Sequence, residues 1–246
     1  NVCVSDSSFL ELEVKNKFNE WGVNWEENTK ESNFLKDADL VIKSPGISNE
    51  SFSVTNANKL GVPIISEIEF AFRYTNAKII GITGTNGKTT TTELTYHILK
   101  NSGLNVGIAG NIGKSFAQQV AENSFEIYVL ELSSFQLDNI VDFAPDIAII
   151  TNISPDHLNR YNNNFNNYIN SKLKITLNQT SKQFLLLNAN DSILINAYEN
   201  HFTEAKKHLF GFDIKGYSKT SYKKNSISIE NKKYKTMIST NSFRLK

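Results

Sequence analysis

The residues best suited to chemistry lie in a glycine-rich turn that follows an apolar segment. Residues 79–90 read Ile-Ile-Gly-Ile-Thr-Gly-Thr-Asn-Gly-Lys-Thr-Thr, and a helical pattern begins directly after the last glycine. The backbone N–H groups of such a turn, with the positive end of the helix, bind phosphate oxygens. Lys88 adds a positive charge toward the β- and γ-phosphates, and the Thr89 hydroxyl is a ligand for Mg²⁺. The stretch therefore predicts a nucleoside triphosphate site.

The turn departs from the strict phosphate-loop pattern. That pattern has a glycine six positions before the lysine, whereas position 82 is Ile. The stretch is better written TGTNGKTT, over residues 83–90, which is a narrower variant of the loop. On its own, the variant still indicates only a generic triphosphate site.

Three further residues could hold a metal ion or take part in chemistry. Glu131 lies near the end of an apolar segment, where a carboxylate is costly unless it is paired or bound to a cation, so it either binds Mg²⁺ or reaches water. His157 follows another apolar segment, at the edge where α/β sheets bind ligands, and is the best candidate among the four histidines for ligand or metal contact. Lys172 falls in the middle of a predicted helix, where a solvated lysine is the ordinary interpretation.

Three polar residues lie close to these candidates and have ordinary structural interpretations. Asn111 stands in a Gly-Asn-Ile-Gly turn, for which common turn chemistry is sufficient. Ser133 and Gln136 come directly after Glu131, where capping of a helix is the simplest role for both side chains. A role in ligand binding is the alternative for all three.

Strand-like and helical segments alternate along most of the chain, which predicts the α/β class with largely parallel sheets. A boundary near residues 75–77 divides a first domain, 1–76, from a nucleotide-binding domain, 77–246. Near the end of the chain, polar and apolar residues alternate at 226–229 and 235–239, which predicts an antiparallel hairpin at the edge of the sheet. The other predicted strands cover 2–4, 38–43, 62–65, 106–108, 127–132, 147–150 and 184–187, and the predicted helices cover 9–21, 49–60, 165–177 and 191–198, with further helices ending at 72 and beginning after 88.

Composition argues against several classes of partner. The formal net charge of the 246 residues is +1, which gives no electrostatic basis for binding nucleic acid or an anionic membrane. The longest apolar runs are strand-length, shorter than the roughly 20 residues that a membrane span needs. Cys3 is the only cysteine, so an internal disulfide is impossible and a reducing compartment, the cytoplasm, is expected.

Five motifs occur in an order that resembles the Mur ligases, the ATP-dependent amide ligases of peptidoglycan precursor synthesis. The resemblance covers essentially the whole chain, including a Ser-Pro-Gly-Ile turn at 44–47. The residues of the third and fourth motifs resemble those of the branch of the family that adds D-glutamate. The motifs are Thr83–Thr90 (TGTNGKTT), Gly110–Gly113 (GNIG), Glu131–Leu137 (ELSSFQL), Thr151–Tyr161 (TNISPDHLNRY) and Ser171–Lys174 (SKLK).

The resemblance implies a partial Rossmann-like domain followed by a phosphate-loop α/β domain that binds ATP. It implies that Lys88, His157 and Lys172 are catalytic and that two Mg²⁺ ions are bound, one by Thr89 and Glu131 and one by His157 and Lys172. A lysine at the position of Lys172 is carbamylated by CO₂ in this family, which requires a neutral amine. The implied ligands of the ATP phosphates are Gly84, Thr85, Asn86, Gly87, Lys88, Thr89 and Thr90.

The resemblance also implies the substrates, UDP-N-acetylmuramoyl-L-alanine and D-glutamate, and a reaction through an acyl phosphate in a monomeric enzyme. The uridine diphosphate end would contact the first domain, and the muramoyl-alanine end would contact the second. The implied substrate-binding residues are Ser7, Ser44, Pro45, Gly46, Asn111, Ser133, Gln136 and His157.

Two differences from the family pattern set further expectations. Members begin with an additional strand and glycine-rich turn, and they end with a third α/β domain that supplies much of the amino-acid pocket. We therefore expect an incomplete first domain, no C-terminal domain, and a chain that binds nucleotide but does not ligate D-glutamate by itself.

Two other functions remain possible from the sequence. One is a ligase of the same superfamily with another acceptor, such as a relative of the folylpolyglutamate synthases. The other is a nucleotide-binding module without ligase activity, which needs no metal cluster of Glu131, His157 and Lys172.

Overall fold

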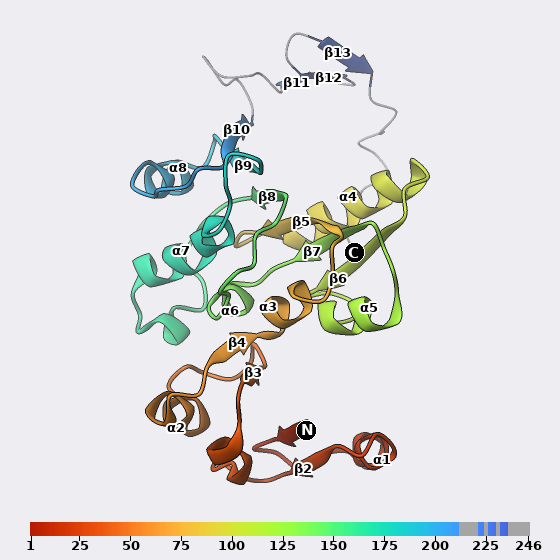
Figure 1. Ribbon diagram of the computed structural model, residues 1–246. Coiled ribbons are helices and arrows are strands. Elements are labelled where there is room, and N and C mark those ends of the chain that lie inside the picture. The colour runs from red at the N-terminus through yellow and green to blue at the C-terminus, as the bar shows by residue number, and fades with distance from the viewer. Residues whose placement is uncertain (212–220, 224–225, 230–231, 236–246) are drawn as a thin grey trace. The chain divides into compact units, whose positions relative to one another are not determined.

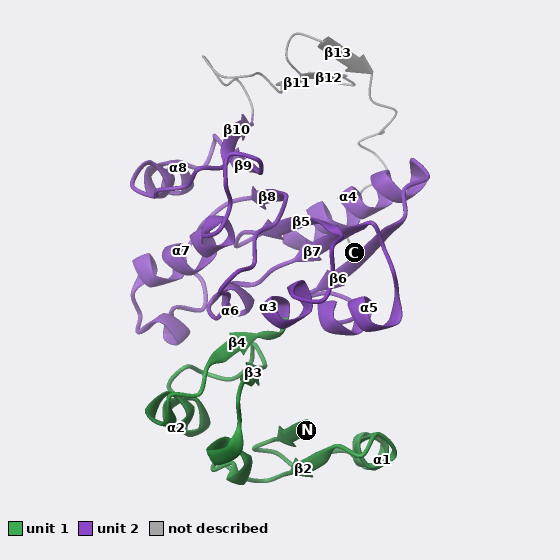
Figure 2. Cartoon of the chain, viewed as in Figure 1, with its two compact units in different colours: residues 1–67 green, residues 68–246 purple. Residues whose placement is uncertain are grey.

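The computed structural model describes residues 1–211, 221–223, 226–229 and 232–235. Two compact units make up the chain, residues 1–67 and residues 68–246 (Figure 2). The predicted domain boundary lies a few residues later, at 76/77, and stays a prediction.

The first unit alternates strands with helices, as the sequence predicts. Its strands pair in parallel, β1 with β2 and β3 with β4. Helix α2 follows its N-cap, Ser51, whose side chain accepts from the N–H of Val54, and it ends before its C-cap, Gly61, which has φ 72°. The elements are β1 (Cys3–Ser5), α1 (Leu12–Glu20), β2 (Asn24–Glu26), the 3₁₀ helix η1 (Asn33–Asp37), β3 (Val41–Lys43), α2 (Phe52–Leu60) and β4 (Ile64–Ser66).

The second unit is built on a six-stranded parallel sheet with strand order β10-β9-β8-β5-β7-β6 (Figure 1). The sheet and its flanking helices confirm the predicted α/β class. Helix α3 (Glu67–Phe72) joins the two units. The other elements are β5 (Lys78–Thr83), α4 (Lys88–Asn101), β6 (Val106–Gly110), α5 (Phe116–Glu122), β7 (Ile127–Glu131), α6 (Ser134–Leu137), β8 (Ile147–Ile150), η2 (Leu158–Tyr161), α7 (Phe165–Leu173), η3 (Lys174–Thr176), β9 (Phe184–Asn188), α8 (Ser192–Glu199) and β10 (Lys206–Phe210).

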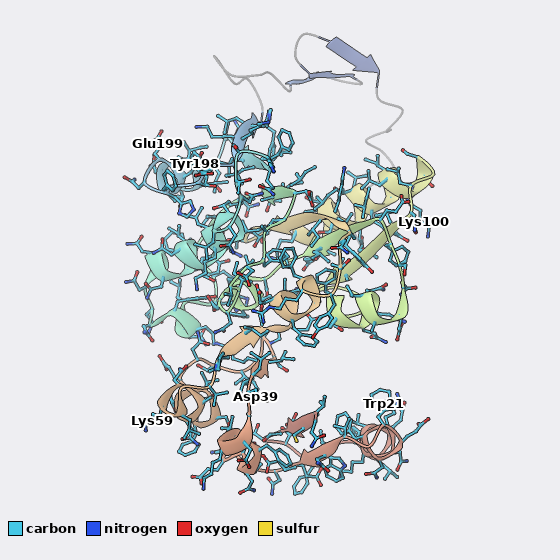
Figure 3. All side chains as sticks on the ribbon, viewed as in Figure 1. Trp21, Asp39, Lys59, Lys100, Tyr198 and Glu199 are labelled. Carbon is cyan, nitrogen blue, oxygen red and sulfur yellow. The ribbon has the colours of Figure 1, made fainter. Side chains whose placement is uncertain are left out.

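Alternate residues of the central strands pack against helices on the two faces of this sheet. On one face, Ile82 and Val129 pack with Tyr96 and Leu99 of α4. On the other face, a larger core joins the sheet to α3, α5, α6 and α7. Lys100, labelled in Figure 3, lies in the last turn of α4, where a positive charge interacts favourably with the helix dipole. The other end of α4, its amino end, directly follows the glycine-rich turn.

The sheet register brings the carboxyl ends of three strands together. Ile82 of β5 lies opposite Glu131 of β7, and Thr83 lies opposite Ile150 of β8. The segments that leave these three strands therefore meet at one edge, which is where open α/β sheets bind ligands.

The structure differs from the sequence-based expectations at several elements. Strands β2 and β10 and helices η1 and α5 are additional to the prediction. The helix predicted over 165–177 changes from α to 3₁₀ geometry at Lys174. Near the end of the chain, β11 (Ser221–Lys223), β12 (Ser226–Ile229) and β13 (Lys232–Lys235) pair antiparallel, which confirms the predicted strand at 226–229. Its partner on the C-terminal side is 232–235, and residues 236–239 of the predicted partner strand at 235–239 lie outside the described residues. The three strands form a sheet of their own, so the expectation that the hairpin extends the main sheet is wrong for the described residues.

Candidate functional site

The glycine-rich turn connects β5 to α4, and both of its glycines have positive φ. Gly87 is the N-cap of α4, with φ 80°, a value that favours glycine. Gly84 has φ 145°, and a Cβ atom at this position would overlap the Thr151 hydroxyl. The loop therefore needs glycine at position 84 for both its backbone conformation and its packing.

We expect Gly84→Ala to lower the free energy of unfolding by about 1–3 kcal/mol, because the new methyl group meets Thr151 in a backbone region that L-residues disfavour. Urea unfolding of the chain measures this. Gly46→Ala is the matched control, since a Cβ at Gly46 meets nothing within 4 Å. Equal stability of the two variants would contradict the assigned loop geometry.

Residues that leave β8 hold the loop in place. The Asn152 side chain accepts from the N–H of Asn86 at 2.8 Å and donates to the Asn86 carbonyl at 2.8 Å. The Thr151 hydroxyl donates to the same carbonyl at 2.7 Å. Thr85 donates to the Ser154 carbonyl and also contacts the hydroxyl of Tyr168, which lies on α7. The loop is therefore fixed before any nucleotide binds, which lowers the entropic cost of binding.

Two lysine amines converge on one carbonyl oxygen of the loop. Lys88 Nζ lies 3.1 Å from the oxygen of Gly84 and 2.8 Å from that of Thr85. Lys172 Nζ, from α7, lies 2.8 Å from the same Gly84 oxygen. The Lys172 side chain is one of the largest fully buried side chains in the described part of the chain, with 2% of the residue exposed. The interpretation of Lys172 as an ordinary solvated lysine is therefore wrong.

Burial and charge together change the ionisation of Lys172. Desolvation, and next the positive charge of Lys88, lower the pKa of the Lys172 amine from 10.5 to about 7. The carboxylates of Asp156 and Asp138 act in the opposite direction but are weaker. Near neutral pH a large fraction of this amine is unprotonated and nucleophilic.

We expect the stability of the fold to rise with pH between about 7 and about 10.5 through Lys172. Since folding lowers this pKa from 10.5 to about 7, the unfolded chain binds more protons over that range. The contribution is at most about 1.4 kcal/mol per pH unit, and the penalty is full below pH 7. Urea unfolding at about pH 7 and about pH 9 should show Lys172→Met losing its advantage over the wild type as pH rises. A constant difference would contradict the lowered pKa.

Glu131 is the last residue of β7, which pairs with the strand that precedes the loop. It is 2% exposed, and its Oε1 accepts from the Asn111 side chain at 2.8 Å. Its Oε2 is buried and has no hydrogen-bond partner. A buried carboxylate oxygen without a partner is costly, and a cation would satisfy it.

These donors fit Mg²⁺ but do not form a complete metal cage. Mg²⁺ is commonly bound by one or two carboxylates together with water and substrate phosphates. Glu131 offers a free oxygen, and the exposed Thr89 lies in the first turn of α4. Among the described residues, no three His, Cys, Asp or Glu side chains gather into a metal site. The chemistry therefore fits a Mg²⁺ ion whose remaining ligands come from phosphates and water.

His157 lies at the same edge of the sheet, but its side chain is more exposed than those of Glu131 and Lys172. It has φ 48° and precedes η2, and its side chain is 58% exposed. Its Nε2 lies 3.5 Å from Asp156, and its ring lies 5.4 Å from that of Phe135. A Mg²⁺ ion shared by His157 and Lys172 stays a prediction.

The predicted substrate residues fall in several places. Asn111 is held against Glu131, as described above. Ser133 and Gln136 form a reciprocal capping box at the start of α6, so their ordinary structural interpretation is confirmed. In the first unit, Ser7 follows β1, and Ser44, Pro45 and Gly46 follow β3. Binding of substrate by all of these residues stays a prediction.

Sequence reasoning missed several residues that shape the site. Asn152 and Tyr168 contact the phosphate loop but were not predicted as site residues. Asn152 had a usable signal, because polar residues at the carboxyl end of a strand beside the loop strand point to the same edge. Tyr168 had no such signal, because an aromatic residue four positions before Lys172 is expected simply to pack the buried face of the helix.

Known proteins match most of this chain. The protein family described as the Mur ligase middle domain matches residues 82–246 of this chain. The UDP-N-acetylmuramoylalanine–D-glutamate ligase of Bacteroides fragilis is 51% identical over 209 residues, which is 85% of this chain and 47% of that protein. The protein of the same name from Porphyromonas gingivalis is 39% identical over 94% of this chain and 52% of its own length. This chain thus spans about half the length of the curated relatives it matches.

Solved structures agree on the fold. The chain is similar to a UDP-N-acetylmuramate:L-alanyl-gamma-D-glutamyl-meso-diaminopimelate ligase from Neisseria meningitides, with a TM-score of 0.61, 17% identity, and coverage of 94% of this chain and 77% of that one. No described helix is both long and apolar enough to cross a bilayer. The family model covers well over half of the residues and includes the phosphate loop, Glu131, His157 and Lys172, so this chain belongs to the Mur ligase family.

Proposed function

We propose that this chain is part of an ATP-dependent amide ligase that adds D-glutamate to UDP-N-acetylmuramoyl-L-alanine in peptidoglycan precursor synthesis. The strongest support is that the amines of Lys88 and Lys172 both contact the carbonyl oxygen of Gly84, in the loop that would bind the nucleotide phosphates. A simple nucleotide-binding module has no use for a second, buried amine at this position. The 51% identity to a relative named for this reaction supports the same conclusion.

The first step is transfer of the γ-phosphoryl group of ATP to the substrate carboxylate. A bond forms between a carboxylate oxygen and the γ-phosphorus, the bond from that phosphorus to its bridging oxygen breaks, and ADP leaves. Lys88 would exchange its two carbonyl partners for phosphoryl oxygens and neutralise their charge. The N–H groups at the start of α4 would bind the β-phosphate.

The second step forms the amide bond. The amine of D-glutamate attacks the carbonyl carbon of the acyl phosphate and loses a proton, and the C–O bond to phosphate breaks. Asn111, Ser133, Gln136 and His157 would orient the muramoyl-alanine end. Holding the two reactants in contact is the main contribution of these residues.

Thr89 and Glu131 are the proposed ligands of one Mg²⁺, and His157 and Lys172 those of a second. When bound, Mg²⁺ supplies charge neutralisation for phosphoryl oxygens. The lowered pKa of Lys172 suits carbamylation, in which its neutral amine adds to CO₂ and releases one proton. The product is a carboxylate-like oxygen ligand on a side chain that otherwise is a cation.

The first unit would bind the uridine diphosphate end of the substrate through Ser7 and the turn of Ser44, Pro45 and Gly46. In this proposal residues 1–76 form the substrate-binding domain and 77–246 the ATP-binding domain. The enzyme would act as a monomer in the cytoplasm, where its substrates are made.

Direct measurement of the ligation product tests this function. The complete enzyme is incubated with ATP, Mg²⁺, D-glutamate and UDP-N-acetylmuramoyl-L-alanine, and the dipeptide product is measured. Parallel reactions use other UDP-muramoyl precursors, a folate acceptor and L-glutamate. Product only with the first pair supports the proposal, product with another acceptor supports a different ligase, and ATP binding without any product supports a binding module.

A further inference from the structure

A buried hydrogen-bonded cluster lies beside the catalytic edge and involves none of the predicted site residues. It consists of Ser134, Asp138, Tyr161 and Ser171, here called the Asp138 cluster. The Ser171 hydroxyl lies 2.6 Å from Asp138 Oδ1 and 2.9 Å from the Ser134 carbonyl oxygen. The Tyr161 hydroxyl lies 3.2 Å from Asp138 Oδ2 and 3.2 Å from Ser171 Oγ. Hydroxyl groups from two other segments thus bind the carboxylate of Asp138, and Ser171 also contacts the backbone of Ser134.

Three members of the cluster are close in sequence to a proposed metal ligand. Ser134 begins α6, three residues after Glu131. Tyr161 ends η2, four residues after His157. Ser171 directly precedes Lys172 on α7. The cluster therefore connects the three segments that carry these ligands.

Both side-chain oxygens of Asp138 serve as hydrogen-bond acceptors in the cluster. The donors to both oxygens are hydroxyl groups, and the Asp138 side chain is only 14% exposed. Burial raises the pKa of the Tyr161 hydroxyl to about 12, so this group stays a donor at physiological pH. An amide at position 138 would replace one acceptor oxygen with an NH₂ group facing a hydroxyl. Lys174, which donates to the Asp138 carbonyl at 2.8 Å, adds a nearby positive charge.

We propose that Asp138 is a positioning residue, which holds the segments of Glu131, His157 and Lys172 in the arrangement that binds Mg²⁺. The inference rests on the proposed function. Asp138 touches no reacting atom, and it acts through Ser171 and Tyr161. Partners that orient metal ligands in this way typically contribute about 10–100-fold to metal affinity or activity.

The test uses Asp138→Asn in the complete enzyme, with Asp146→Asn as the matched control. Asp146 accepts from the N–H of Ile79 at the start of β5, at the opposite edge of the same sheet. We expect Asp138→Asn to lower kcat and Mg²⁺ affinity by about 10–100-fold. The KM for ATP should stay within about twofold, because the hydrogen bonds that fix the phosphate loop do not involve Asp138. Asp146→Asn should lower the Tm while it leaves kcat and Mg²⁺ affinity unchanged.

Mg²⁺ affinity is measured by calorimetry in the presence of ADP, so one readout does not depend on turnover. Wild-type kcat and Mg²⁺ affinity in Asp138→Asn would overturn the inference, as would equal losses in Asp146→Asn. If Asp138→Asn fails to fold, Tyr161→Phe and Ser171→Ala each remove one hydrogen bond to the Asp138 carboxylate and should show smaller losses of the same kind. A wild-type enzyme that makes no product contradicts the proposed function, whereas the Mg²⁺ titrations still decide the role of Asp138.

Discussion

Lys88→Ala in the complete enzyme is expected to lower kcat by about 10³-fold or more, the loss seen when a preorganised group that stabilises transition-state charge is removed. The Lys88 amine lies within hydrogen-bond distance of two loop carbonyls and sits directly at the amino end of α4. It therefore reaches the phosphates without reorganising the loop. Steady-state kinetics with saturating ATP and Mg²⁺ measure the effect.

Lys100→Ala is the matched control for this prediction. Lys100 lies in the last turn of the same helix and donates to the hydroxyl of Tyr96, far from the loop. Its removal should leave kcat unchanged. Near-normal turnover in Lys88→Ala would show that this lysine does not stabilise the transferring phosphoryl group.

Lys172→Ala is expected to lower kcat by about 10²–10³-fold, because it removes both the second amine and the proposed metal ligand. Nucleotide binding should persist, since Lys88 still contacts the loop carbonyls. Calorimetry with ADP and steady-state kinetics separate these two effects. A variant that loses nucleotide affinity to the same degree as kcat would assign Lys172 to the loop rather than to catalysis.

Bicarbonate provides a second readout for Lys172. The wild-type enzyme should lose activity when CO₂ is removed and regain it with bicarbonate, more readily above pH 7, where the amine is neutral. Lys172→Ala should not respond. A wild-type enzyme independent of bicarbonate, with an unmodified amine in a well-resolved crystal structure, would exclude the carbamate.

The phosphate loop was predictable because its signal is local. Glycine at positions 84 and 87, followed by Lys88, encodes a backbone conformation within one short segment. The strand before the loop and the helix after it follow from the same local pattern. Helix α4 accordingly begins at Lys88, directly after the last glycine, where the sequence predicts a helix to begin.

Elements with weak or mixed patterns were less predictable. Strand β10 (Lys206–Phe210) begins with two lysines and lies at the edge of the sheet, where charge replaces an alternating apolar pattern. Helix α5 has only seven residues, although its N-cap, Ser115, accepts from the N–H of Gln118 and offered a usable signal. Both elements depend on tertiary packing more than on local propensity.

The sequence predicts candidate site residues but not their arrangement in space. Sequence spacing could not show that Lys172 is buried, because that depends on α7 packing against the loop. The convergence of Lys88 and Lys172 on Gly84 joins residues 88 positions apart. The unpartnered oxygen of Glu131 likewise depends on Asn111, which takes the other oxygen. Such long-range contacts determine the chemistry and are invisible to local patterns.

Formation of an acyl phosphate at this site can be followed by isotope transfer. UDP-N-acetylmuramoyl-L-alanine is labelled with ¹⁸O in its alanyl carboxylate and incubated with the complete enzyme, ATP, Mg²⁺ and D-glutamate. Because the carboxylate oxygen attacks the γ-phosphorus and leaves with it, the account predicts one ¹⁸O atom in each phosphate released. Product formation with unlabelled phosphate would contradict the account.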